Sequence, residues 1–176
     1  MPIIPINGKT PVIAKSTWVA ADVVLVGEVE LAEGCGVFYG CVLRADSDRI
    51  TIASGTNIQD GCVLHADPGF PVKVGENVSV GHRAVLHGCT IENDVLVGMG
   101  AIVLNGAYIG SGSLIAAGAV ILEGSNIPSN SLVAGVPAKI RRETSAEERT
   151  AIVQNAINYR ELSALNAAGE LASGDI

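Results

Sequence analysis

The sequence predicts an all-β solenoid: a parallel β-helix built from six-residue repeats and followed by a C-terminal α-helix. Three observations support this fold class. Large aliphatic residues recur with a period of six, small residues follow them at a fixed distance, and glycine is abundant (21 residues) while aromatic residues make up only 3% of the chain. A unit this small cannot bury its apolar side alone, so successive units must stack to form a core.

The repeat extends from about residue 10 to about residue 140, with two insertions and one five-residue unit. Six residues are too few for a helix face and do not fit a simple hairpin alternation. We therefore expect three hexapeptides to form one coil of a three-faced prism, with successive coils paired as parallel strands ~4.8 Å apart. Every repeat position is Ile, Val or Leu: Ile13, Val19, Leu25, Leu31, Val37, Leu43, Ile52, Ile58, Leu64, Val74, Val80, Leu86, Ile91, Val97, Val103, Ile109, Ile115, Ile121, Ile127 and Val133.

The residue four places after a repeat position is usually small, which suits a tight corner of the prism. These residues are Thr17, Cys35, Cys41, Thr56, Cys62, Ala84, Ala101, Ala107, Ser113, Ala119 and Ser125. The four cysteines have no metal-type spacing, and we interpret them as reduced thiols, with core packing the favoured role for Cys35, Cys41 and Cys62.

The repeat stops after residues 136–138 (VPA), and a helical pattern follows. Residues 145–148 (SAEE) have the form of a capping box, and apolar residues then fall three or four apart, at Ile152, Ala156, Tyr159 and Leu162. We predict a helix over about 146–167, ended near Gly169 and lying along the prism or over a neighbouring subunit. The tail GELASGDI is expected to fray. The chain is thus one domain, with the β-helix over 1–140 and the packed helix and tail over 141–176.

Charge and composition exclude several classes of partner. The net charge is −7, without a run of Lys or Arg, which argues against nucleic acid. No uninterrupted apolar stretch of about 18 residues occurs, so we expect no membrane span. The N-terminal MPIIPINGK has no basic region typical of a signal peptide. These features predict a cytoplasmic protein.

All three histidines of the chain fall between residues 65 and 87. In the repeat phase, His65 and His87 each follow the aliphatic residue of a second face, one coil apart, so their imidazoles can converge on one metal ion. His82 follows a first face and should point elsewhere. If three prisms pack around a threefold axis, His82 of a neighbour can supply a third nitrogen. Three imidazoles with an open fourth position are typical of catalytic zinc, although Fe²⁺ and Co²⁺ also suit such ligands.

Four segments carry a resemblance to a known family: VLRADSDRITIASGTNIQDGCVLH, VGHRAVLHGC, VGMGA and VAGVPAK. They resemble the γ-class carbonic anhydrases and their compact bacterial relatives, which include the carnitine-operon and phenylacetate-operon proteins. The resemblance implies a left-handed β-helix, a homotrimer, and His65, His82 and His87 as metal ligands, with His82 donated across the subunit interface. It also implies reversible hydration of CO₂ to bicarbonate by a metal-bound hydroxide.

The same resemblance implies roles for residues around the metal. Arg44 and Asp46 match a pair that family members use across the interface, although an ordinary ion pair is an alternative. Asn57 and Gln59 match polar residues near the metal-bound water, with Asn57 alternatively a turn residue and Asp60 a supporting residue. Tyr159 matches a helix tyrosine that reaches toward the site.

The chain departs from the best-characterised active branch of the family in two places. That branch has a long acidic loop after the first histidine, where this chain has ADPGFPVK with Asp67 as its one carboxylate, and a glutamate where this chain has Ser47. A proton relay is therefore missing, and we expect low activity. Two other functions stay open: an acyl-CoA thioesterase or hexapeptide acyltransferase, and a non-catalytic metal-bound trimeric scaffold.

Overall fold

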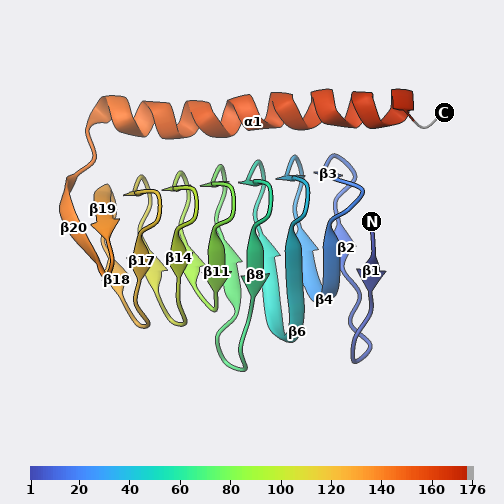
Figure 1. Cartoon of the computed structure of the whole chain (residues 1–176), viewed down its shortest axis with the longest axis horizontal. Coiled ribbons are helices and arrows are strands. Elements are labelled where there is room, and N and C mark those ends of the chain that lie inside the picture. Colours follow the sequence, from blue (N-terminus) through green and yellow to red (C-terminus); the bar gives the residue numbers. More distant parts are fainter. Residues whose placement is uncertain (174–176) are drawn as a thin grey trace.

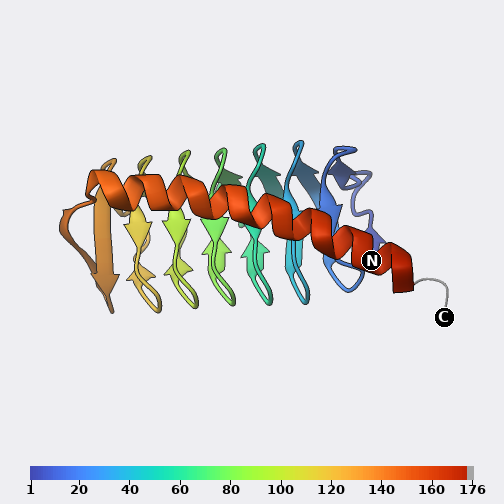
Figure 2. The same ribbon diagram turned by 90° about the horizontal axis from the view of Figure 1, so that it is seen from above.

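The computed structural model describes the backbone of residues 1–173 and the burial of residues 1–169. Within this part of the chain, short strands stack into a long prism, and one α-helix runs along its length (Figures 1 and 2). The parallel β-helix with a C-terminal helix, which the six-residue period predicts, is confirmed. No helix of the described residues is long and apolar enough to span a bilayer.

The first face of the prism is an eight-stranded sheet in which seven parallel strands are followed by one antiparallel strand, as far as the chain is described. The hairpin of the last two strands ends the stack, because β20 lies at the sheet edge. The strands are β3 (Trp18–Val19), β5 (Gly36–Val37), β7 (Asn57–Ile58), β10 (Ser79–Val80), β13 (Leu96–Val97), β16 (Leu114–Ile115), β19 (Ser131–Gly135) and β20 (Ala138–Glu143).

The second and third faces belong to one twelve-stranded sheet, again counting only the described residues. Two long strands, β4 (Val24–Leu31) and β6 (Val42–Ile52), continue from the second face into the third. The second face also contains β1 (Ile3–Ile4), β8 (Val63–His65), β11 (Val85–His87), β14 (Ile102–Val103) and β17 (Val120–Ile121). The third face also contains β2 (Val12–Ile13), β9 (Val72–Val74), β12 (Thr90–Ile91), β15 (Tyr108–Ile109) and β18 (Asn126–Ile127).

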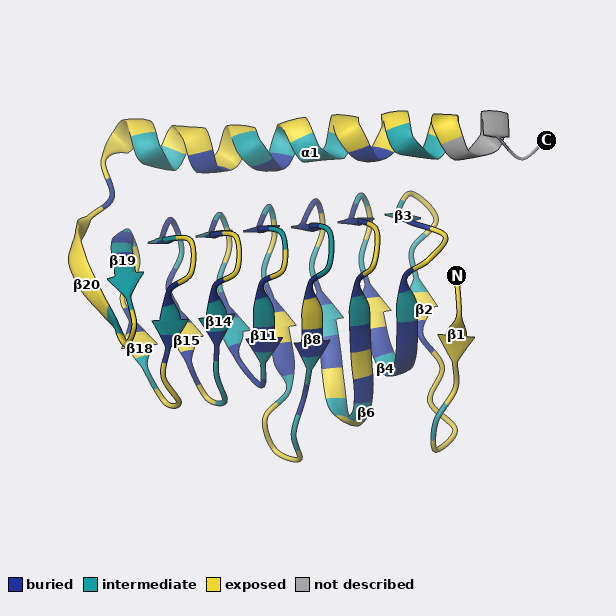
Figure 3. Cartoon of the chain, in the orientation of Figure 1, coloured by how far each residue is buried: buried dark blue, intermediate teal, exposed yellow. Residues whose placement is uncertain are grey.

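The interior of the prism is filled by the repeat residues. All repeat positions from Leu25 to Val133 are buried, whereas Ile13 and Val19 at the first coil are partly buried (Figure 3). The ladder register stacks equivalent residues of successive coils, as in Leu43, Leu64 and Leu86. Cys41 and Cys62 are fully buried corner residues in the same core. Apolar burial between neighbouring coils therefore stabilises the stack.

Helix α1 (Ala146–Ser173) begins where the capping box predicts. The Glu148 N–H donates to Ser145 Oγ (3.2 Å), and the Ser145 N–H donates to Glu148 Oε2 (2.8 Å). The predicted end near Gly169 is wrong, because the helix continues to Ser173. One glycine inside a helix costs only about 1 kcal/mol, which does not end it. Of the tail that was expected to fray, residues 174–176 lie outside the described residues.

The helix covers the first face of the prism (Figures 1 and 2). Ile152 and Ala156 are buried against it, as the spacing predicts, but Leu162 is 41% exposed and Ser163 is buried instead. A Cβ atom at Gly36 would lie 2.1 Å from Ser163 Oγ, so the helix packs too closely here for a larger residue on either side. The small side chain at position 163 permits this close approach.

Candidate metal centre

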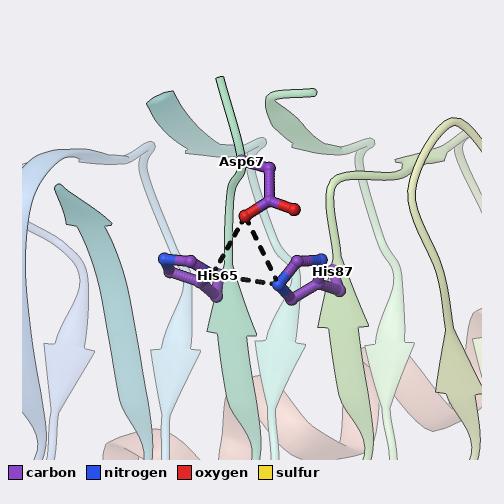
Figure 4. A group of neighbouring side chains, drawn as sticks. All are labelled: His65, Asp67 and His87. Atoms are coloured by element: carbon purple, nitrogen blue, oxygen red, sulfur yellow. Dashed lines mark hydrogen bonds and ion pairs between the residues drawn. The ribbon is translucent and has the colours of Figure 1, made fainter. Parts of the chain in front are cut away.

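The parallel register of β6, β8 and β11 places Arg44, His65 and His87 in one column on the second face. His65 Nδ1 lies 2.9 Å from His87 Nε2 (Figure 4). Both side chains are partly buried, at 14% and 29% exposure. Two of the three histidines are therefore brought together by one chain.

The remaining ring nitrogen of each histidine faces a hydrogen-bond acceptor. His65 Nε2 lies 3.1 Å from Asp46 Oδ1, and His87 Nδ1 lies 2.8 Å from Asn105 Oδ1. Because a carboxylate can only accept, the proton of His65 must be on Nε2. The amide nitrogen of Asn105 donates to Asp67 Oδ2 (2.9 Å), so its oxygen faces His87 and accepts from Nδ1.

This assignment leaves a lone pair on His65 Nδ1 and another on His87 Nε2. Two neutral acceptors 2.9 Å apart repel each other unless a proton or a cation lies between them. Two ligand atoms at ~2.0–2.1 Å from a tetrahedral Zn²⁺ are about 3.4 Å apart. The observed separation is within about half an ångström of that value, so the donor set fits a transition metal.

Asp67 is a third donor at the same place. Its Oδ1 lies 3.9 Å from His65 Nδ1 and 3.9 Å from His87 Nε2, on the loop that follows β8 (Figure 4). The three residues form a candidate metal site within one chain. The sequence shows Asp67 only as the one carboxylate of the ADPGFPVK insertion, without a ligand role. Its position two residues after His65 was the one sequence feature that could have indicated a ligand role. The six-residue period does not predict where the side chains of an inserted loop lie.

Arg44 and Asp46 form an ion pair within the chain, with Arg44 Nη1 2.6 Å from Asp46 Oδ2. The hydrogen bond from Arg44 lowers the pKa of Asp46, partial burial opposes this, and the contact with His65 lowers the pKa further. Asp46 therefore stays charged and holds the His65 ring by its Nε2–H, while Arg44 holds Asp46. Such outer partners fix the tautomer and direction of a metal-binding imidazole.

His82 lies apart from this pair. It follows β10 of the first face, and its Nδ1 contacts Asp60 Oδ2 at 2.7 Å while Tyr159 Oη lies 3.4 Å from its Nε2. The Asp60 carboxylate accepts a hydrogen bond from Nδ1–H of His82. The lone pair of His82 is then on Nε2, which is the atom that could bind a metal ion. Tyr159 packs edge-on against Phe38 at 5.4 Å, and burial followed by the charge of Asp60 raises the pKa of its phenol. All three histidines thus have one nitrogen oriented by an acceptor.

Asn57 and Gln59 lie next to each other and are both buried. The Gln59 amide donates to Asn57 Oδ1 (3.1 Å), and the Asn57 amide donates to Ser79 Oγ (2.9 Å). Asn57 begins β7, and its side chain links two coils. The Gln59 side chain therefore has one end fixed by Asn57.

A cavity of about 360 Å³ lies between α1 and the first face. Gln59, His82, Tyr159 and Asn155 supply polar groups at its wall. Its apolar lining includes Leu96, Met99, Leu114, Ile115, Ala116 and Ala117. Asn155 Oδ1 is buried without a hydrogen-bond partner among the described residues, so a donor in the cavity would satisfy it. The sequence alone gives no signal that Asn155 lines this cavity.

Comparisons with known proteins show similarity to hexapeptide-repeat proteins, some of which are named carbonic anhydrases. The family model for bacterial transferase hexapeptide (six repeats) matches residues 88–123. A Methanocaldococcus jannaschii protein named as a probable carbonic anhydrase is 46% identical over 151 residues, covering 86% of this chain and 95% of that protein. The solved structure of a hexapeptide transferase family protein from Anaplasma phagocytophilum has a TM-score of 0.89 at 36% identity, over 92% of this chain and 96% of that one.

The mitochondrial gamma carbonic anhydrase 2 of Arabidopsis thaliana is 40% identical over 165 residues, which cover 90% of this chain. The aligned part spans only 59% of that relative's length. The fold and paired histidines define a hexapeptide-repeat protein with a candidate metal site. With the Methanocaldococcus relative matched over nearly its whole length, the chain belongs to the γ-carbonic anhydrase-like family of hexapeptide-repeat proteins.

Proposed function

We propose that the protein catalyses the reversible hydration of CO₂ to bicarbonate at a metal site shared between subunits of a homotrimer. The observation that carries this proposal is the 2.9 Å approach of His65 Nδ1 to His87 Nε2, with the other ring nitrogen of each histidine facing a hydrogen-bond acceptor. His65, His87 and the neighbour's His82 would hold Zn²⁺, or alternatively Fe²⁺ or Co²⁺, and an ion held there would lower the pKa of a coordinated water toward ~7, giving hydroxide near neutral pH.

The trimer brings His82 of one subunit to the His65–His87 pair of the next. A continuous apolar row supports packing of the second face against a second copy, because it lies in the same strands as the histidine column. The row consists of Val42, Val63, Val85, Ile102 and Val120, and Val63 is 41% exposed. Burying such a row stabilises an oligomer.

The side chains beside His82 and His65 have distinct tasks in this reaction. Asn57 fixes the amide of Gln59, which leaves Gln59 Oε1 to accept a hydrogen bond from the attacking water and so to orient it. Asp60 orients His82 through Nδ1. Tyr159 closes the cavity above His82, and Arg44 with Asp46 orients His65. The four buried, free cysteines suit a reducing compartment, which favours the cytoplasm.

The test is stopped-flow CO₂ hydration by protein purified without oxygen and loaded with Zn²⁺, Co²⁺ or Fe²⁺. We expect metal-dependent activity that is abolished in His65→Ala. A Tyr159→Phe variant keeps the contact with Phe38 and tests the contribution of the hydroxyl that lies 3.4 Å from His82 Nε2. Full metal binding without CO₂ hydration in any metal form would reject the carbonic anhydrase activity.

Mixing two inactive variants tests the shared site. A His65→Ala chain lacks one half of the site and a His82→Ala chain lacks the other half. After co-refolding, trimers of both chains contain some intact sites, so activity should return to roughly the fraction expected from random assembly. Mixing two preparations of His65→Ala is the control. No recovery in the mixed sample would reject donation of His82 across the interface.

One observation favours a second candidate, hydrolysis of an acyl thioester. The cavity beside His82 has about 360 Å³ and a largely apolar lining, which is more room than CO₂ needs. The same oriented water would then attack an acyl carbonyl. Release of CoA from acyl-CoA esters of increasing chain length, measured with a thiol reagent that reports free CoA, distinguishes this activity from CO₂ hydration.

A further inference from the structure

We propose that Asp67 is a metal ligand of the single chain and gives way to His82 when subunits assemble. A chain that has not yet assembled with other subunits then already binds the ion through His65, Asp67 and His87. This inference rests on the proposed function only for the identity of the incoming ligand, His82.

The contacts around Asp67 support a ligand role. Its two carboxylate oxygens have different surroundings, because Oδ2 accepts from the Asn105 amide (2.9 Å) while Oδ1 faces both histidines at 3.9 Å. The amide therefore fixes the carboxylate with one oxygen directed at the free lone pairs. The Asp67 carbonyl accepts from the Phe70 N–H (2.8 Å), so the loop that carries the side chain forms a closed turn.

The donor set is chemically complete for a first-row transition metal. Two imidazole nitrogens and one carboxylate oxygen form a common three-residue ligand set, and open positions remain for water or a further ligand. A carboxylate also neutralises part of the charge that the ion brings to a face occupied by Arg44. The side chain of Asp67 is 43% exposed, so it can rotate away without rebuilding the core.

The requirement for an open position explains why Asp67 must leave. Three imidazoles together with a carboxylate would fill four positions, which is the arrangement of a structural site rather than a catalytic one. If His82 of a neighbour replaces Asp67, the assembled site keeps its place for water. The Asp67 carboxylate thus allows the chain to bind the metal before assembly. Assembly then replaces this carboxylate with His82 and leaves a coordination position for water.

The test measures Co²⁺ affinity and the visible absorption of bound Co²⁺ in full-length chains. The four proteins are the wild type, Asp67→Asn, His82→Ala and the double variant. We expect His82→Ala to bind one Co²⁺ per chain, and the double variant to bind at least about tenfold more weakly. In the wild-type background, Asp67→Asn should change affinity by less than about threefold, because His82 replaces the carboxylate.

Asp48→Asn is the matched control. It removes the same charge beside the same loop, where Asp48 Oδ2 accepts from the Gly69 N–H (2.9 Å), and its amide oxygen can still accept that hydrogen bond. The proposal is overturned if Asp67→Asn has no effect in the His82→Ala background, if Asp48→Asn has the same effect, or if His82→Ala binds no metal. Absence of CO₂ hydration in metal-loaded wild type rejects the proposed activity but not the ligand exchange.

Discussion

His87 Nδ1 donates to Asn105 Oδ1 at 2.8 Å, and the other end of the same amide donates to Asp67. One side chain therefore fixes both the tautomer of His87 and the position of the nearby carboxylate. Asn105 reaches this position because β14, the strand before it, is paired with β11, the strand that carries His87. The stacking of coils thus places an orienting residue beside each of the paired imidazoles.

Replacing Asn105 with Ala should weaken Zn²⁺ or Co²⁺ binding by about 10–100-fold, because the His87 ring loses the acceptor that directs Nε2 toward the metal. Competition with a chromophoric chelator measures the affinity. Asn126→Ala on the exposed third face is the control, and it should bind metal like the wild type. Equal affinities in the two variants would contradict the orienting role.

Replacing Gly88 with Ala should disturb the site and the fold together. Its φ is +57°, and an added Cβ would lie 2.1 Å from Asn105 Oδ1 and 2.7 Å from Phe70 Cβ. Gly100 is a matched control, because its φ is +67° but an added Cβ meets nothing within 4 Å. Gly100→Ala should cost about 1 kcal/mol of left-handed strain.

We expect Gly88→Ala to cost more than Gly100→Ala in urea unfolding and, in addition, to weaken metal binding. Titration with Co²⁺ gives the second quantity. If both variants lose the same stability and bind Co²⁺ equally well, the close approach between Gly88 and Asn105 does not position His87.

The prism and the histidine column follow from the sequence because both depend on period alone. Once the coils stack, the residue directly after Leu64 must lie beside the residue directly after Leu86. The structure confirms this, because His65 and His87 are paired in the ladder. The phase also predicts that His82 lies elsewhere. Local signals were sufficient for the start of α1, where Ser145 and Glu148 form the capping box.

Features that depend on inserted or distant segments were not predictable in this way. The period does not describe the path of the loop that carries Asp67. Asn155 belongs to a helix whose packing depth is set by Gly36 and Ser163, so its place in the cavity wall required the structure. The predicted helix end lies too early because Gly169 costs only about 1 kcal/mol inside the helix and does not stop it.

The core should respond strongly to truncation at the coil that carries His87. Leu86 is fully buried in the column of aliphatic side chains, so Leu86→Ala should lower the free energy of unfolding by about 2–5 kcal/mol. Leu122→Ala is the same substitution at a residue that is 50% exposed, and it should change stability by less than about 1 kcal/mol. Urea unfolding followed by circular dichroism compares them. Similar losses would mean that the prism interior is not the main source of stability.

The pH dependence of helix capping can be tested at Glu148. Hydrogen bonding from Arg142, followed by that from the Ser145 N–H, lowers the pKa of Glu148 from 4.5 to about 2. A pKa that is lower in the folded state means that the stabilisation is fully present above about pH 4.5 and is lost as the pH falls toward 2.

The urea midpoint of the wild type should therefore exceed that of Glu148→Gln near pH 6, and the two midpoints should converge as the pH approaches 2. Glu161→Gln, which removes a charge from the exposed side of the same helix, is the control and should show no such convergence. Amide hydrogen exchange in the first turn of α1 locates the effect, because the lost contacts hold that turn. A difference between wild type and Glu148→Gln that stays constant from pH 6 to pH 2 would show that the charged carboxylate does not stabilise the helix start.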